Sequence, residues 1–115
     1  MYQILEELNK TSGISGSLLV GSDGIIIAAD LDTRFQDETV GALAASIVST
    51  VDKSLEKLQA THFKQVTIEA DKGKLFLTDV GIGVLVVTTE PDVNMGLVRL
   101  EIKNAHQRIQ TRGSM

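Results

Sequence analysis

The sequence has 115 residues, of which 43% are hydrophobic and 23% are charged, and its formal net charge is −4. Such a composition argues against disorder, and we expect residues 1–115 to form a single domain. The 11 Lys and Arg residues are spread along a net acidic chain, which disfavours a nucleic-acid binder. The absence of cysteine excludes disulfides, zinc–thiolate sites and thiol catalysis.

The N-terminal segment MYQILEELNK lacks the apolar stretch of a signal peptide, and no apolar run approaches the length of a membrane span. We therefore expect a cytoplasmic protein. The terminal Gly113-Ser114-Met115 carries no weight in these predictions.

The first third of the chain predicts one short helix and a β-hairpin. A helix is expected over residues 2–11, with Gly13 placed to end it. Aliphatic runs at 16–21 and 24–30 predict two strands. Asp23-Gly24 between them is a strong signal for a tight hairpin turn.

A long helix is expected over residues 37–59. Asp37 is a plausible N-cap, and Asp37 and Glu38 carry the negative charge that the start of a helix favours. A 3-4-3-4 spacing of apolar residues predicts one buried face. Its members are Val40, Leu43, Ala44, Ile47, Val48, Val51, Leu55 and Leu58.

Three strands and a helix are expected in the remaining chain. Residues 63–70 alternate between apolar and polar, which is typical of a half-exposed strand near an edge. Asp71-Lys72-Gly73 predicts a hairpin turn into a strand at 74–79. The run 84–89 is apolar on both faces and should lie in the middle of the sheet, and Pro91 stops it. A last helix is expected over 94–110.

The predicted order is α-β-β-α-β-β-β-α. Two hairpin-type segments separated by a helix indicate an α/β fold of the α+β sandwich kind, with a five-stranded, mainly antiparallel sheet and helices on its faces.

No catalytic or phosphate-binding motif is present. The two histidines, His62 and His106, stand without a nucleophile motif and are interpreted as surface residues. Gly73-Lys74 does not complete a P-loop. Gly81-Ile82-Gly83 precedes a strand where a dinucleotide site needs a helix. We therefore expect no catalytic residue and no cofactor.

A metal site is also not expected. Asp30, Asp32, Asp37 and Glu38 place four carboxylates in nine residues, but Arg34 falls where an EF-hand requires a ligand. A solvated loop before an acidic helix start is the preferred interpretation.

The features that remain point to an interaction surface. Small residues form a second stripe on the long helix, at Gly41, Ala45 and Ser49, with Ala42 beside them. They allow another helix to approach, and a bland alanine-rich solvent face is the alternative. The edge strand could pair with a second copy of itself. The strand residues assigned to this predicted dimer interface are Lys64, Gln65, Val66, Thr67 and Ile68.

Leu97 and Leu100 lie off the apolar stripe of the last helix. They either pack under the first helix or form a docking patch for a partner.

Several segments together resemble the roadblock/dynein light chain family. They are Gly16 followed at the seventh and eighth positions by Asp23-Gly24, the alanine-rich helix 40–51, the strand 66–70 with its glycine turn, Gly81-x-Gly83-x-Leu85, and Gly96-Leu97-Val98-Arg99. The resemblance covers residues 2–110 and depends on the order and spacing of these segments.

The resemblance implies a sheet with the long helix on one face and the terminal helices on the other. It also implies homodimers or heterodimers formed through the long helix and the edge strand that follows it. Family members serve as dynein light chains, as scaffold subunits and, in the MglB type, as bacterial regulators of Ras-like GTPases. Those regulators insert no arginine finger, so Arg34 and Arg99 are not expected to be catalytic.

The leading hypothesis is a non-enzymatic, homodimeric scaffold that binds a small Ras-like GTPase and stimulates its GTP hydrolysis. A passive structural subunit is one alternative, and a small-molecule sensor or enzyme is another. The sequence leaves open which partner is bound, whether the dimer contains one or two kinds of chain, and whether the protein is an activator or an adaptor.

Overall fold

The predicted elements occur in the predicted order in the computed structural model, which describes residues 1–113. Ser114 and Met115 of the predicted domain lie outside the described residues. The elements are α1 (Tyr2–Leu8), β1 (Ile14–Val20), β2 (Ile26–Asp30), α2 (Asp37–Lys57), β3 (Gln65–Ala70), β4 (Gly73–Asp79), β5 (Val84–Thr89) and α3 (Met95–Gly113).

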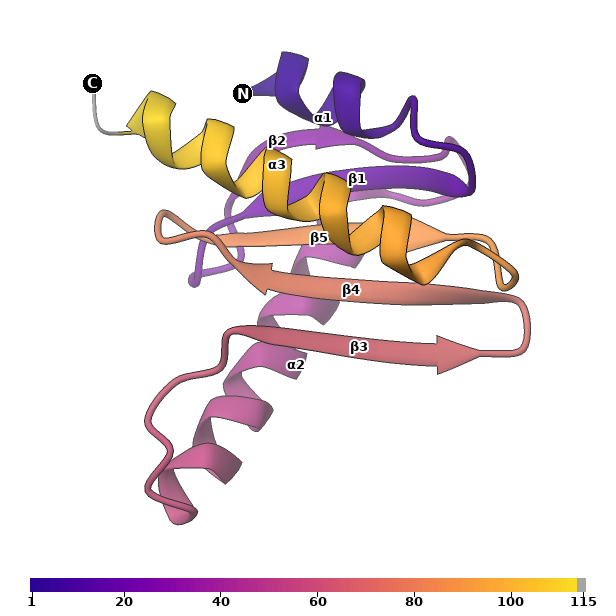
Figure 1. Cartoon of the computed structure of the whole chain (residues 1–115). Coiled ribbons are helices and arrows are strands. Elements are labelled where there is room, and N and C mark those ends of the chain that lie inside the picture. The colour runs from indigo at the N-terminus through magenta and orange to yellow at the C-terminus, as the bar shows by residue number, and fades with distance from the viewer. Residues whose placement is uncertain (114–115) are drawn as a thin grey trace.

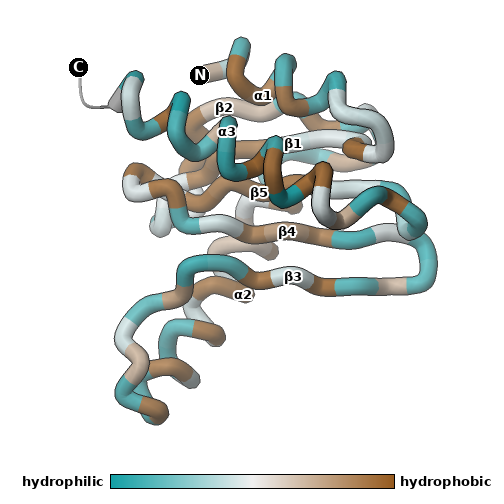
Figure 2. Tube along the Cα trace, viewed as in Figure 1, coloured by the Kyte–Doolittle hydropathy of each residue, from teal (hydrophilic) through white to brown (hydrophobic). Residues whose placement is uncertain are grey.

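The five strands form one antiparallel sheet in the order β2-β1-β5-β4-β3. The central place of β5 is confirmed: Val86 pairs with Leu18 on one side and with Leu77 on the other. The edge position of β3 is confirmed as well. Figure 2 shows the hydrophobic colour gathered in the central strands, whereas the turn between β3 and β4 is hydrophilic.

Helices cover both faces of this sheet, as the resemblance implied. In Figure 1, α1 and α3 lie in front of the sheet and α2 crosses behind it. Alternation along each strand sends successive side chains to opposite faces. Leu85 and Val87 therefore face α1 and α3, and Val84 and Val86 face α2.

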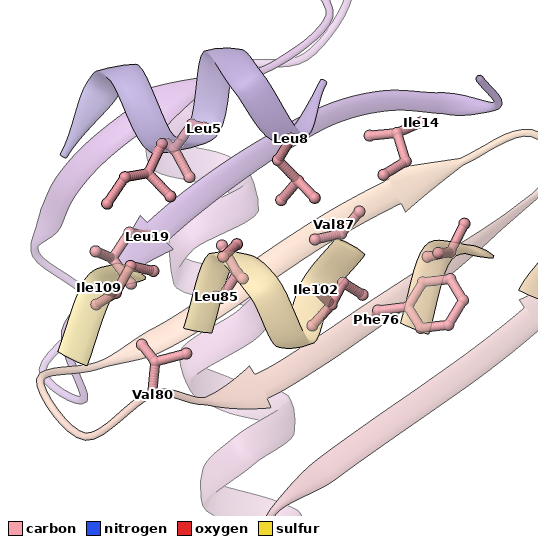
Figure 3. Packing of buried hydrophobic residues seen from close by; sticks show 13 residues of the cluster. Leu5, Leu8, Ile14, Leu19, Phe76, Val80, Leu85, Val87, Ile102 and Ile109 are labelled. Carbon is pink, nitrogen blue, oxygen red and sulfur yellow. The ribbon is translucent and has the colours of Figure 1, made fainter. Parts of the chain in front are cut away.

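Each face has its own hydrophobic cluster. The cluster under α1 and α3 (Figure 3) is filled mainly by Ile4, Leu5, Leu8, Ile14, Leu19, Phe76, Val80, Leu85, Val87, Val98, Ile102, Ala105 and Ile109. The cluster under α2 contains Leu18, Val20, Ala44, Val48, Phe63, Leu77, Val84 and Val86. No helix within residues 1–113 is long and apolar enough to cross a membrane.

The first hairpin turn forms where Asp23-Gly24 predicted it. Gly24 has a φ of +86°, and the Asp23 carboxylate accepts a hydrogen bond from the Ile25 amide at 3.0 Å. The predicted end of the first helix is wrong. α1 ends at Leu8, and Gly13, with a φ of +92°, lies in the turn before β1 instead.

The long helix differs from its prediction in two respects. Its N-cap is Gln36, in extended conformation, so Asp37 is the first helical residue and not the cap. Its predicted buried face is confirmed except at two positions, since Leu43 and Leu58 are 58% and 75% exposed, and Gly41 is buried instead. The residues of that face that pack in the cluster under α2 are Val40, Ala44, Ile47, Val48, Val51 and Leu55. Gly41 packs closely on the sheet: a Cβ there would lie 3.4 Å from the side chains of Val20 and Ile26, at the tight end of ordinary contact.

The backbone at Gly83 packs closely against β1, and substituting this glycine tests that contact. A Cβ at this position would collide with the carbonyl oxygen of Val20, which cannot move without shifting β1. Gly83→Ala should lower the free energy of unfolding by about 1–3 kcal/mol. Urea denaturation measures the change.

The matched control is Gly96→Ala in the first turn of α3. A Cβ there meets only the Asn94 carboxamide oxygen, at an ordinary 3.5 Å. This change should leave stability equal or raise it by up to about 1 kcal/mol, since glycine disfavours helix. Equal effects of the two substitutions would contradict the packing at Gly83.

Candidate functional site

The sheet face under α2 is only partly covered by that helix. α2 packs mainly against β1, β2 and β5, crosses the sheet obliquely, and runs on past the β3 edge at its C-terminal end (Figure 1). The part of β3 and β4 near their connecting turn is therefore left without a helix on this face. Ile68 of β3 is 39% exposed there, and Leu75 beside it is only half-buried.

A groove of about 500 Å³ runs between α2 and this bare part of the sheet. Its walls are mostly apolar: Phe35, Val40 and Leu43 on the helix side, and Leu75 and Val86 on the sheet side. A second hollow of about 320 Å³ shares Phe35 and Leu75 with it and extends to Ile68 at the edge strand. Together they form a continuous apolar surface from α2 to β3, which we name the α2–β3 groove.

The edge strand completes this surface. β3 pairs with β4 only, so its outer side offers backbone N–H and C=O groups to another strand. Val66 and Ile68 point toward the α2 side of the sheet, where Val66 joins the cluster under α2. Gln65 and Thr67 point to the opposite side, and Lys64 directly before the strand is exposed.

The small-residue stripe predicted for pairing does not adjoin the edge strand. Ala42 and Ser49 are exposed, but Ala45 lies beside Gly24 at the β1–β2 turn, on the far side of α2 from β3. Gly41 does not lie on a free surface at all, because it packs on the chain's own β1 and β2. The helix residue that the structure brings next to the β3 side is Leu43, which the sequence had placed in the core.

The segment between α2 and β3 is held by a histidine bridge. The His62 Nδ1 lies 3.0 Å from a carboxylate oxygen of Asp52 in α2, and its Nε2 lies 3.0 Å from one of Asp79 at the end of β4. Both nitrogens donate when the imidazole carries two protons. The Phe63 amide also donates to Asp52 at 3.0 Å. The bridge thereby links α2 to the end of β4 through the segment that precedes β3.

The candidate partner patch lies on the other side of the molecule. Leu97 and Leu100 are both exposed on α3, so the interpretation that they pack under α1 is wrong.

The acidic segment near residue 30 is engaged in local contacts. Asp30 accepts hydrogen bonds from the Asn9 carboxamide at 2.9 Å and from the Tyr2 hydroxyl at 3.4 Å, and its charge raises the pKa of Tyr2. Asp32 pairs with Arg34 at 3.4 Å. Within residues 1–113, no three His, Cys, Asp or Glu side chains are grouped so as to hold a metal ion.

Comparison with known proteins identifies the family. The family model described as "Roadblock/LC7 domain" matches residues 1–89. The chain belongs to the Roadblock/LC7 family. Among curated proteins, it is 39% identical over 108 residues to the uncharacterized proteins MJ1340 and MJ0310 of Methanocaldococcus jannaschii, with 94% of this chain and 95% of each relative covered.

Solved structures of Roadblock/LC7 proteins match the whole fold. The structure of Myxococcus xanthus MglB matches with a TM-score of 0.92 and 25% identity, over 98% of this chain and 86% of that one. A Roadblock/LC7 domain from Streptomyces avermitilis matches with a TM-score of 0.90 and 18% identity, over 100% and 98%. The family and the fold implied by the sequence resemblance are thus confirmed.

The histidine bridge is expected to stabilise the Roadblock fold only modestly. His62→Ala should lower the free energy of unfolding by about 1 kcal/mol or less, because the imidazole is 54% exposed and exposed ion pairs are weak. His106→Ala, which breaks no ion pair, is the control and should change stability by less than about 0.5 kcal/mol. A loss of several kcal/mol from His62→Ala would contradict this expectation and show that the bridge stabilises the whole fold.

Proposed function

We propose that this Roadblock/LC7 protein is a non-enzymatic homodimer that binds a small Ras-like GTPase and stimulates its GTP hydrolysis. The observation that carries the proposal is the match to Myxococcus xanthus MglB over 98% of the chain, at 25% identity. The sequence resemblance implies the same kind of regulator. We further propose that the protein acts in the cytoplasm and that its role is carried by its surface and not by a reaction centre.

The α2–β3 groove is the proposed dimer interface. It combines an unpaired strand edge with an apolar surface that the chain's own helices leave bare. A second copy related by a two-fold axis would pair its β3 with this β3 and place the side of its own α2 over the bare strands. A single contact would then pair the strand edge and cover the apolar surface. A related structure described as MglB with tetrameric arrangement supports self-association within the family.

Within the proposed interface, Leu43 takes the place of Gly41. The predicted β3 residues from Lys64 to Ile68 stay in the proposal, with Ile68 and the backbone of β3 at its centre. Ala42 and Ser49 line neither hollow of the groove and stay in the proposal only as exposed residues of α2. Ala45 is half-buried beside the β1–β2 turn and lies at most on the rim.

A single charge at Leu43 tests the interface. Leu43→Asp should convert the dimer to a monomer, because the carboxylate would have to be buried in an apolar contact, while the monomer should keep its stability since Leu43 is mostly exposed. Sedimentation velocity measures the mass, and urea denaturation checks the fold.

Leu100→Asp is the matched control, since Leu100 is similarly exposed on α3. This variant should stay dimeric. A Leu43→Asp protein that remains as dimeric as the wild type would contradict the proposed interface.

The GTPase itself is tested by affinity capture from native lysate, once with a non-hydrolysable GTP analogue and once with GDP. We expect a small Ras-like GTPase mainly in the sample with the GTP analogue, and faster GTP hydrolysis when the purified proteins are combined. Capture of partners regardless of nucleotide would contradict the regulator and favour the passive structural subunit. Leu97→Asp tests whether the exposed leucines of α3 contribute to this contact.

A further inference from the structure

A cavity of about 600 Å³ lies on the face of the sheet opposite the α2–β3 groove, between α3 and the strands β3 and β4. This volume is in the range of small-molecule sites. Its lining residues are Lys64, Gln65, Thr78, Asp79, Gly81, Arg99, Ile102, Lys103, His106 and Gln110.

Basic side chains dominate this lining. Arg99, Lys103 and His106 have the i, i+4, i+7 spacing that places them along one side of α3, and Lys64 faces them from the start of β3. None of the four side chains has an ion pair or hydrogen bond with any described residue. The gathering of Lys64, Arg99 and Lys103 around one cavity is unusual in a chain whose net charge is −4.

The one carboxylate in the lining is already engaged. One oxygen of Asp79 lies 3.0 Å from the His62 Nε2, and the other accepts a hydrogen bond from the Gly81 amide at 2.9 Å. Both oxygens of Asp79 therefore have partners at the end of β4, and its single negative charge is outnumbered in the lining by Lys64, Arg99 and Lys103.

A buried hydroxyl provides a second, independent observation. Thr78 of β4 lines the cavity and is 8% exposed, and its Oγ1 has no hydrogen-bond partner. It is the one buried side-chain polar atom without a partner in the part of the chain that the structure describes. Since buried polar groups are almost always satisfied, an acceptor that reached this hydroxyl from the cavity would be stabilised by it.

We propose that this cavity binds the phosphate group of a small soluble molecule. A phosphate dianion offers several acceptor oxygens and matches the donors present: the planar guanidinium of Arg99, the ammonium groups of Lys64 and Lys103, and the Thr78 hydroxyl. A cationic ligand would be repelled, and a neutral one would leave the basic side chains without a counter-charge. The site lies on the opposite face of the sheet from the α2–β3 groove but shares Lys64 and Gln65 with the proposed dimer interface, so its variants are placed on α3, at Arg99 and Lys103, where they test it apart from the proposed function.

Titration of the 115-residue protein with inorganic phosphate and with pyrophosphate tests the site. Amide chemical shifts are followed by NMR at constant ionic strength. The expected result is saturable change at Thr78, Lys103 and His106, with tighter binding of pyrophosphate. Sodium chloride at matched ionic strength should give no saturable change, and citrate should bind more weakly than pyrophosphate. Equal responses to all salts, or saturation by citrate alone, would overturn the proposal.

Two variants link the binding to the named residues. Arg99→Gln combined with Lys103→Gln should weaken pyrophosphate binding by about tenfold or more, since each lost charge-assisted contact is a strong one. Arg108→Gln removes a charge from the same helix but outside the cavity and should leave the affinity unchanged. Equal losses from both changes would show general charge attraction and overturn the site.

Thr78→Val separates a binding role from a structural one. Valine keeps the shape and removes the unpartnered hydroxyl, so the melting temperature without ligand should stay equal or rise. The additional rise in melting temperature on adding pyrophosphate should shrink relative to the wild type. An undiminished rise would overturn the assignment of the Thr78 hydroxyl to the ligand.

Discussion

The structure depends on one strand that is apolar on both faces. β5 lies in the middle of the sheet, and its residues Val84–Val87 are buried from both sides. Such a strand is stable only if a layer covers each of its faces. In this fold α1 and α3 cover one face and α2 covers the other. The two hydrophobic clusters are separate, and β5 joins them.

The two layers are unequal, and this inequality explains where the surfaces lie. One long helix running obliquely cannot cover five twisted strands, so the α2 face keeps an apolar strip beside the unpaired β3 edge. α1 and α3 together cover more of the other face and end at a rim of basic side chains. The first surface suits a second protein chain, and the second suits a small anion.

The sequence predicts the strands and their order along the chain well, because each strand has a local signal such as the Asp23-Gly24 turn or the two-sided apolar run of β5. It fails at the margins of the buried face of α2, where Leu43 is exposed and Gly41 is buried. Residues 40–48 are apolar or small around almost the whole helix, so no polar side fixes the direction of burial. Gly41 does pack closely on a neighbouring element, but that element is the chain's own sheet and not a second helix. The basic cavity was missed because Lys64 and Thr78 meet α3 only in the folded chain, although the spacing of Arg99, Lys103 and His106 was available.

We propose above all that a second copy of the chain covers the α2–β3 groove and pairs with β3. Hydrogen–deuterium exchange at several protein concentrations tests it most directly, because the chain has two sheet edges and β2 serves as an internal reference. The account predicts that outward-pointing amides of β3 become protected as the concentration rises, whereas those of β2 do not change. Exchange at β3 that is as fast as at β2 and independent of concentration would contradict it.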